Sequence, residues 1–295
     1  MKNKYESWGY AFISPFLVIF LIFGLYPIIN TLTLSFQRWD GLMPSSSAGT
    51  SNYRRLFSDE VFSLSILNTL RIWIMNYVPQ LLTALLIATL MTFNRIRGMR
   101  FFRAAFYLPN LITAASVGLL FNLLLNGDTS AMNHLLLALG MPGAPFKFLS
   151  DPMFTSAVVS YIQWWMWFGY TTIIVMAGML TIDKSIFEAA MVDGASKFQT
   201  FTRVTLPLIN PTILYLTITS IIGGMQLFDV PVTLTNGYGD PQKAILTSTM
   251  YIYNQGFRSR NFGYASAVSM GLFVIIAVLC AVSYRFLQGR QEINE

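Results

Sequence analysis

Six long stretches of this chain contain no charged residue. They cover residues 7–37, 72–94, 104–127, 152–182, 204–228 and 261–284. Each is longer than the roughly 20 residues that a helix needs to cross about 30 Å of hydrocarbon. A segment in lipid must satisfy its own backbone hydrogen bonds, and the alternation typical of barrel strands is missing. The pattern predicts an all-α integral membrane protein with six transmembrane helices, near 10–36, 66–93, 102–126, 154–180, 206–228 and 263–287, in one domain covering 1–295.

The composition agrees with this prediction. Hydrophobic residues make up 54% of the chain, charged residues only 11%, and the mean hydropathy is +0.54. A soluble protein cannot build its surface from so few charges. The first apolar stretch could be a secretory signal sequence, but its run from Tyr10 to Ile29 is too long and lacks a convincing small-residue cleavage site. We therefore expect it to be the first span.

Basic residues predict the orientation of these spans, because cytoplasmic loops are enriched in lysine and arginine. Their density favours a cytoplasmic N-terminus and a cytoplasmic C-terminus. The net charge of +6 then reflects basic residues that orient the spans in the membrane, and we expect no nucleic-acid partner. The segments expected inside hold Lys2, Lys4, Arg95, Arg97, Arg100, Arg103, Lys184, Lys197, Arg203, Arg285 and Arg290, and the longer outside loops hold Arg38, Arg54, Arg55, Lys147, Lys243, Arg258 and Arg260.

The sequence offers little catalytic or metal-binding chemistry. Cys280 is the single cysteine and His134 the single histidine, so neither a disulfide nor a zinc site can be assembled from them. A phosphate-binding loop is also missing, since Lys197 in Gly-Ala-Ser-Lys lacks the required glycine spacing. We expect no enzyme activity and no cofactor bound by this chain. ATP hydrolysis would have to come from another subunit.

The loop at 181–205, between the fourth and fifth spans, carries two helix-start signals. Ser185 and Glu188 have the spacing of a capping box, which predicts a helix from about Ile186 that ends at Gly194. Ser196 and Gln199 repeat the spacing and predict a second short helix to about Val204. Small and apolar residues on the first helix favour close approach by another protein. An amphipathic helix lying on the bilayer surface is the alternative.

The order of residues in this loop resembles a known family. Glu188-Ala189-Ala190, then Asp193-Gly194-Ala195, then Leu206-Pro207 and Pro211 are similar to the cytoplasmic coupling loop of binding-protein-dependent ABC importer permeases. The carbohydrate-uptake branch, which includes maltose, glycerol-phosphate and lactose permeases, is the best likeness. Four further elements make the resemblance cover nearly the whole chain: Trp39-Asp40-Gly41, Asn52-Tyr53, Asn68-Thr69 and Thr235-Asn236-Gly237.

This resemblance implies a permease subunit in the plasma membrane of a prokaryote, with the loop at 181–205 on the cytoplasmic side. It implies as partners a homologous second permease, two ABC ATPase subunits that hold ATP and Mg²⁺, an extracytoplasmic solute-binding protein and membrane lipid. Glu188 would be the charged contact to the ATPase and Gly194 the hinge. The expected ATPase-coupling residues are Ser185, Phe187, Glu188, Ala189, Ala190, Met191, Asp193 and Gly194.

Candidate solute contacts lie in the fourth span. Gln163, Trp167 and Tyr170 recur at helical spacing, with Tyr170 near the middle of the membrane. Aromatic rings stack on the C–H faces of sugars, and amide and phenol groups exchange hydrogen bonds with sugar hydroxyls. An interfacial aromatic belt is the alternative, and it explains Trp164 and Trp165 better.

The fifth span offers a complementary surface of polar groups and adjacent glycines. We expect local unwinding at the glycines to expose backbone carbonyls to the solute, while a kink or a close helix crossing is the alternative. By resemblance these positions line the sugar site of the maltose-type permease, but glycines and Gln226 replace its aromatic and asparagine side chains. The same sugar is therefore not expected. The residues are Ser220, Gly223, Gly224, Gln226 and Leu227.

Ionisable residues within the spans distinguish ion-coupled carriers from transporters with a neutral pathway. Arg71 is expected to be the single charged residue within a span, near its outer end, so the pathway should be neutral and ion coupling is disfavoured. A neutral sugar suits such a pathway. A polyol, glycerol phosphate or an amino acid remains an alternative within the class, and an ion-coupled carrier or a membrane enzyme remains an alternative outside it.

Two further features concern packing and the outer surface. Gly263, Ala267 and Gly271 form a small-residue stripe, which indicates either packing within the chain or a dimer seam. The outside segments 128–151 and 229–260 could receive the solute-binding protein, and the first is expected to carry a short helix near Ala131 to Leu139.

Overall fold

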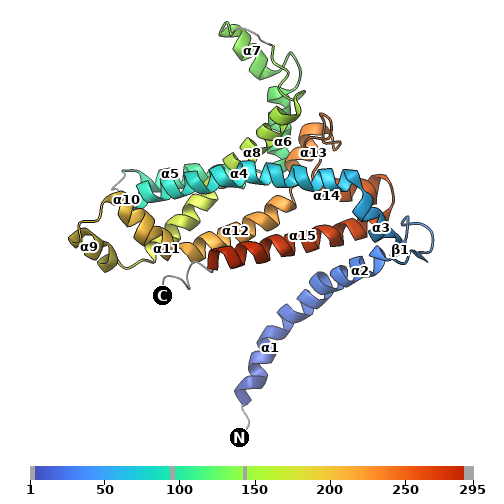
Figure 1. Ribbon diagram of the computed structural model, residues 1–295, viewed down its shortest axis with the longest axis horizontal. Coiled ribbons are helices and arrows are strands. Elements are labelled where there is room, and N and C mark those ends of the chain that lie inside the picture. Colours follow the sequence, from blue (N-terminus) through green and yellow to red (C-terminus); the bar gives the residue numbers. More distant parts are fainter. Residues whose placement is uncertain (1–3, 94–96, 142–144, 289–295) are drawn as a thin grey trace. The chain divides into compact units, whose positions relative to one another are not determined.

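A computed structural model describes residues 4–93, 97–141 and 145–288 (Figure 1). Lys2, Arg95 and Arg290, which entered the orientation argument, lie outside these residues. Two compact units divide the chain: Met1–Phe62 with Tyr251–Val274, and Ser63–Met250 with Ile275–Glu295.

The first unit begins with an almost continuous helical segment. It consists of α1 (Lys4–Ile19), the π-helix η1 (Phe20–Leu25) and α2 (Tyr26–Ser35). Strands β1 (Gln37–Arg38) and β2 (Ser46–Ser47) then pair antiparallel, with Gln37 opposite Ser47. This short hairpin is a local exception in a mostly helical fold, which agrees with the all-α prediction. The unit also holds α3 (Ser51–Ser58), the start of α4 (Glu60–Phe93), the end of α14 (Ser248–Tyr253), the π-helix η4 (Asn254–Arg258) and the first part of α15 (Phe262–Gln288).

The small-residue stripe packs within this unit. A Cβ atom on Gly263 would lie 2.0 Å from the carbonyl oxygen of Gln37, and one on Gly271 would lie 2.9 Å from Leu56 Cδ2. Ala267 between them is fully buried. The stripe therefore serves contacts inside the chain, as the packing alternative predicted.

A carboxylate ties three elements of the first unit together. Asp59 accepts hydrogen bonds from the Tyr251 and Tyr264 hydroxyls and from the amides of Val61 and Phe62 at the start of α4. The Arg55 guanidinium lies 3.8 Å from the Tyr264 ring centroid. Partial burial acts to raise the pKa of Asp59, but the four hydrogen bonds together lower it below the usual value.

The second unit contains the remaining helices. After most of α4 come α5 (Met99–Tyr107), the 3₁₀ turn η2 (Leu108–Leu111), α6 (Ala114–Leu125) and α7 (Ala131–Ala138). The long helix α8 (Pro152–Leu180) precedes α9 (Lys184–Val192), α10 (Lys197–Thr200), the π-helix η3 (Phe201–Thr205) and α11 (Leu206–Leu208). Then follow α12 (Asn210–Met225), α13 (Asp229–Thr235), the start of α14 and the end of α15. Helix α7 confirms the short helix predicted in the 128–151 segment.

Helices α4, α8 and α12 supply one core of this unit. Small residues on α4 allow close packing: Ala84 and Ala88 are fully buried beside Val175 of α8 and Leu216 of α12. Helix α5 also approaches α8 closely, since a Cβ atom on Gly169 would lie 1.8 Å from the Phe106 carbonyl oxygen. Helix α4 runs through Pro79 without a break.

Within the described residues, four helical stretches are long and apolar enough to cross a membrane: Tyr10–Ser35, Glu60–Phe93, Asn210–Thr235 and Phe262–Leu287. Two bent pairs raise this number to as many as six. Helix α8 bends by 74° into α9, and Met99–Leu111 bends by 86° into α6. The prediction of one continuous helix at 102–126 is therefore wrong. Pro109 lacks a backbone N–H, and Ile112 and Thr113 are extended, so the chain turns there.

Candidate functional site

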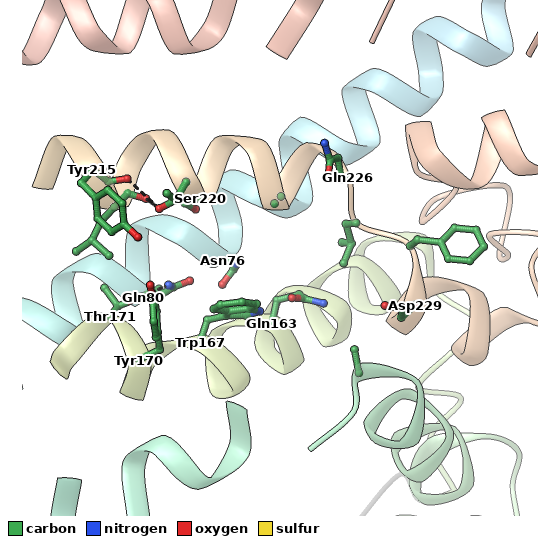
Figure 2. Close-up of a pocket in the computed structure, with 17 residues that line it drawn as sticks. Asn76, Gln80, Gln163, Trp167, Tyr170, Thr171, Tyr215, Ser220, Gln226 and Asp229 are labelled. Atoms are coloured by element: carbon green, nitrogen blue, oxygen red, sulfur yellow. Dashed lines mark hydrogen bonds between the residues drawn. The ribbon is translucent and has the colours of Figure 1, made fainter. Parts of the chain in front are cut away.

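A polar and aromatic cavity lies in the second unit among α4, α8, α12 and the start of α13 (Figure 2). Its volume is about 410 Å³, which falls in the range of small-ligand pockets. The predicted solute contacts all line it, three from α8 and five from the end of α12 and the turn that follows: Gln163, Trp167, Tyr170, Ser220, Gly223, Gly224, Gln226 and Leu227.

The α8 residues present amide and ring surfaces to this cavity. Gln163 is only 8% exposed, whereas Trp167 is 42% exposed. The Trp167 and Tyr170 rings meet edge to face, with centroids 5.8 Å apart. Their right-angle arrangement offers a flat indole face beside a phenol hydroxyl.

Trp73 of α4 contacts two of the α12 residues, Ser220 and Gly224. The Ser220 hydroxyl accepts a hydrogen bond from Trp73 Nε1 at 3.0 Å. A Cβ atom on Gly224 would lie 2.2 Å from Trp73 Cδ1, whereas one on Gly223 would meet nothing within 4 Å. Gly224 therefore serves a close helix contact, the alternative left open by the sequence, and Gly223 leaves its side of α12 open.

The helix does unwind here, but after the glycines. Helix α12 continues through Gly223 and Gly224 and ends at Met225, and α13 begins at Asp229. Gln226 and Leu227 donate backbone hydrogen bonds to the Gly223 and Gly224 carbonyls, both at 3.3 Å. The prediction of unwinding at the glycines is wrong in position, because the helical bonds persist there. The Leu227 carbonyl, in turn, accepts from Thr247 Oγ1 at 2.7 Å.

Several cavity residues were missed by the sequence analysis. Gln80 Nε2 donates to Thr171 Oγ1 at 2.6 Å and links α4 to α8. Asn76 is 8% exposed, and its Oδ1 has no hydrogen-bond partner in the described part of the chain. The two α4 amides are four residues apart in an apolar stretch, a signal that could have found them. The further lining residues are Asn76, Gln80, Ala114, Thr171, Tyr215, Leu216, Thr219, Phe228 and Asp229.

Asp229 corrects the prediction that Arg71 is alone among the spans. It lies within the apolar stretch Asn210–Thr235 and lines the cavity. The charge-free window ends one residue earlier, so this carboxylate was assigned to an outside loop. Arg71 donates instead to Asn68 Oδ1 at 2.8 Å and to the Ala244 carbonyl at 3.2 Å, and it does not line the cavity.

The predicted coupling loop forms two helical segments in the same unit. Helix α9 starts earlier than predicted, because Asp183 is its N-cap and accepts from the Ser185 amide at 2.8 Å. The capping box at Ser185 and Glu188 is thus wrong. The pKa of Asp183 is lowered by this backbone hydrogen bond and by one from the Ser185 side chain. The second capping box, Ser196 with Gln199, is confirmed, and helical structure runs past the predicted end into η3 and α11.

Most of the predicted coupling residues are exposed. Glu188 and Ala189 face solvent on α9, and Met191 is 66% exposed. Phe187 instead packs against Phe93, the last residue of α4, with ring centroids 5.1 Å apart. Ala190 is half-buried, Ser185 lies at the capped start of α9, and Asp193 is its C-cap. Gly194 follows with φ of +74°, a left-handed conformation that favours glycine and ends the helix.

Apolar helices around a polar, ligand-sized cavity are a feature of membrane transport proteins. The chain belongs to the family of binding-protein-dependent transport system inner membrane components, which it matches over residues 3–291.

Curated relatives extend over nearly the full chain. It is 34% identical to the lactose transport system permease protein LacF of Rhizobium radiobacter, over 99% of this chain and 97% of the relative. It is 31% identical to the multiple sugar-binding transport system permease protein MsmF of Streptococcus mutans, over 96% of this chain and 95% of the relative.

Solved structures share the fold. A chain of a bacterial ABC transporter involved in the import of the acidic polysaccharide alginate superimposes with a TM-score of 0.81 at 24% identity, covering 97% of this chain and 96% of that one. The bacterial alginate transporter in complex with a periplasmic protein bound to alginate pentasaccharide gives a TM-score of 0.80 at 24% identity, covering 96% and 94% of the two chains.

Proposed function

We propose that this chain is a permease subunit of an ATP-driven importer of a sugar or oligosaccharide, with six spans and both termini in the cytoplasm. The observation that carries the proposal is that one compact unit holds both the polar and aromatic cavity and the exposed helix α9. A solute site and a surface for an energy-supplying partner are the two parts that such a subunit needs.

The chemistry of the cavity supports a sugar. The exposed Trp167 ring provides a face for the C–H side of a pyranose, and the Gln163 amide and Tyr170 hydroxyl provide hydrogen-bonding groups. The names of the relatives add support, since LacF and MsmF are described as lactose and multiple-sugar permeases.

Family membership and the exposed surface of α9 support the proposed partners. A second, homologous permease would complete the pathway, two ABC ATPase subunits would hold ATP and Mg²⁺, and an extracytoplasmic binding protein would deliver the sugar. The alginate transporter crystallised with a periplasmic protein gives a precedent for the last partner. Exposed Glu188, Ala189 and Met191 would contact an ATPase subunit.

The mechanism uses α9 as a lever. Closure of the ATPase subunits on ATP would shift α9 and, through the connections on either side, tilt α8 and α12, so that the cavity opens outward. The packing of Phe187 on Phe93 supplies a second route, from α9 directly to α4. The three long helices of the cavity wall, α4, α8 and α12, would then respond to one displacement.

A glycerol phosphate importer is the nearest alternative, because the chain is 28% identical to the sn-glycerol-3-phosphate permease protein UgpA of Agrobacterium fabrum. Phosphate sites use cationic groups or a helix start. Lysine and arginine are missing from the residues that line the described cavity, and the helix start there, that of α13, itself carries the carboxylate of Asp229. This charge favours a sugar over a phosphate ester.

The test is reconstitution of this chain with the proposed partner subunits. A sugar that raises the melting temperature of the co-expressed binding protein should be found first. Proteoliposomes with both permeases and the ATPases should then accumulate this sugar only with ATP and the binding protein. Uptake that an ionophore abolishes and that does not require ATP would establish an ion-coupled carrier instead. Stimulation of ATP hydrolysis by an amino acid alone would reject the sugar assignment.

A further inference from the structure

A buried oxygen without a partner marks one wall of the cavity. Asn76 of α4 is more than nine-tenths buried, and its Oδ1 has no hydrogen-bond partner in the described part of the chain. Figure 2 shows its side chain between α4 and the α8 residues Gln163 and Trp167. A buried acceptor that stays unpaired destabilises the protein. On a cavity wall, such an oxygen is available to accept a hydrogen bond from a bound ligand.

The neighbouring α4 amide shows the contrast. Gln80 lies one helical turn from Asn76 on the same face, and its Nε2 donates to Thr171 Oγ1 at 2.6 Å. This hydrogen bond joins α4 to α8 and gives Gln80 a structural contact. Among the residues that the structure describes, Asn76 Oδ1 has no such contact and is available to bind a solute.

A carboxylate lies at the other end of the same cavity. Asp229 begins α13, directly after the unwound turn at Gln226 and Leu227. In Figure 2 the Asp229 carboxylate faces the cavity. Lysine and arginine are both missing from the residues that line the described cavity. A negatively charged ligand would therefore meet an acid without a compensating cation.

We propose that Asn76 Oδ1 and the Asp229 carboxylate accept hydrogen bonds from the hydroxyl groups of an uncharged sugar, and that Asp229 excludes sugars carrying a carboxylate or phosphate. The inference rests on the proposed sugar-import function and adds the charge class of the substrate. It also adds a third helix, α4, to the substrate contacts that the sequence placed on the fourth and fifth spans alone. The alginate transporter that shares the fold handles an acidic polysaccharide, so the two cavities would differ in charge selection.

The experiment measures direct binding, because a binding protein would impose its own selection. The importer with both permeases and the ATPases is placed in lipid nanodiscs without the binding protein. Equilibrium dialysis then gives the dissociation constants of neutral oligosaccharides of two to five units, lactose included, and of matched uronate oligosaccharides. We expect a neutral sugar to bind at least tenfold more tightly than its uronate counterpart. Asp229→Asn should raise the uronate-to-neutral affinity ratio about tenfold.

Asn76→Leu separates a ligand contact from a structural role. Leucine has a similar size and no unpaired oxygen, so the variant should keep or raise the melting temperature of the complex while weakening sugar binding about tenfold. A lower melting temperature with unchanged sugar affinity would show that Asn76 is structural. Asp128→Asn, an exposed acid outside the cavity in the same unit, is the matched charge control and should leave the affinity ratio unchanged.

The outcomes distinguish this inference from the proposed function. If a uronate binds as tightly as the neutral sugar, or if Asp229→Asn leaves the ratio unchanged, charge selection by Asp229 is overturned while sugar import stands. If neither kind of sugar binds, and neither stimulates ATP hydrolysis when the binding protein is restored, the sugar-import proposal fails as well.

Discussion

The indole Nε1 of Trp73 donates a hydrogen bond to the Ser220 hydroxyl at 3.0 Å, and the same ring covers Gly224 one turn further along α12. Trp73 also stacks on Tyr77 of its own helix, with centroids 5.5 Å apart and planes at 9°. Three contacts hold the indole, so it cannot swing aside to admit a side chain at position 224.

Replacing the two adjacent glycines should therefore have unequal effects. Gly224→Ala would force a Cβ atom into the Trp73 ring and should destabilise the protein by about 1–3 kcal/mol, the usual cost of overpacking. Gly223→Ala is the matched control, since a Cβ atom there meets nothing within 4 Å. It should be neutral or slightly stabilising, because alanine favours a helix. Thermal unfolding of the purified protein compares the two, and equal melting temperatures would contradict the account.

Gly194→Asp should abolish sugar-stimulated ATP hydrolysis while leaving membrane insertion intact. Gly194 ends α9 in a left-handed conformation, and a charged side chain there would alter the surface offered to the ATPase. Measurement of ATP hydrolysis with and without sugar and binding protein tests this.

Gly127→Asp is the control for that variant. Gly127 is also left-handed, with φ of +81° and open space around it, but it lies between α6 and α7, far along the chain from the loop. It should retain stimulation. Loss of stimulation in both variants would indicate a general backbone effect, and retention in Gly194→Asp would count against the lever.

Asp59→Asn should lower the stability of the protein at neutral pH, by about 1–3 kcal/mol for weakened hydrogen bonds to a charged group. The pKa of Asp59 is lowered in the folded state, so its contribution is present above the unfolded value, about 3.9, and is lost as pH falls through the folded pKa. Unfolding by denaturant between pH 3 and 7 measures this effect. The free energy of unfolding of the wild type should fall as the pH is lowered, and that of the variant should fall less. An identical pH dependence in the two proteins would contradict the prediction.

Tyr251→Phe tests the same cluster at high pH. Partial burial and the hydrogen bond to Asp59 raise the pKa of Tyr251 to about 12. Its neutral form is therefore favoured in the folded state, and the stabilisation is present below the unfolded value of about 10 and lost as pH rises towards 12. Tyr251→Phe should be less stable at pH 8 and should lose less stability above pH 10 than the wild type does.

The proposed orientation predicts which side of the membrane each loop reaches. In a Cys280→Ser background, Leu137→Cys on α7 should react with an impermeant maleimide in intact cells, because Leu137 is 51% exposed in a segment expected outside. Ala189→Cys on α9 is expected inside and should react only after the cells are permeabilised. The reverse pattern would overturn the topology and, with it, the coupling role of α9.

Much of this structure could be predicted from local patterns. Charge-free windows found the apolar helices, the capping box at Ser196 and Gln199 is present, and helical spacing brought Gln163, Trp167 and Tyr170 to one cavity. These features depend on residues within a few positions of each other, which is the range over which helix geometry acts.

The errors have physical reasons of two kinds. Asp183 and Ser185 are both good cap residues, and spacing alone could not choose between them. Asn76 was missed because the cavity joins helices that are far apart in sequence. Asp229 was missed because a window that stops at charged residues cannot include a carboxylate at a helix start. The Trp73 contact likewise explains Gly224 only once α4 lies beside α12.

The contact between Phe187 and Phe93 joins α9 to the end of α4 that the proposed orientation places on the cytosolic side. From Phe93 to Asn76 the helix runs for about 25 Å, at 1.5 Å per residue. Pro79 sits between Asn76 and Gln80 and deprives the backbone carbonyl of Met75 of its helical donor. In the proposed mechanism, a displacement of α9 would therefore be transmitted along α4 as far as Pro79, beside the proposed solute contact Asn76.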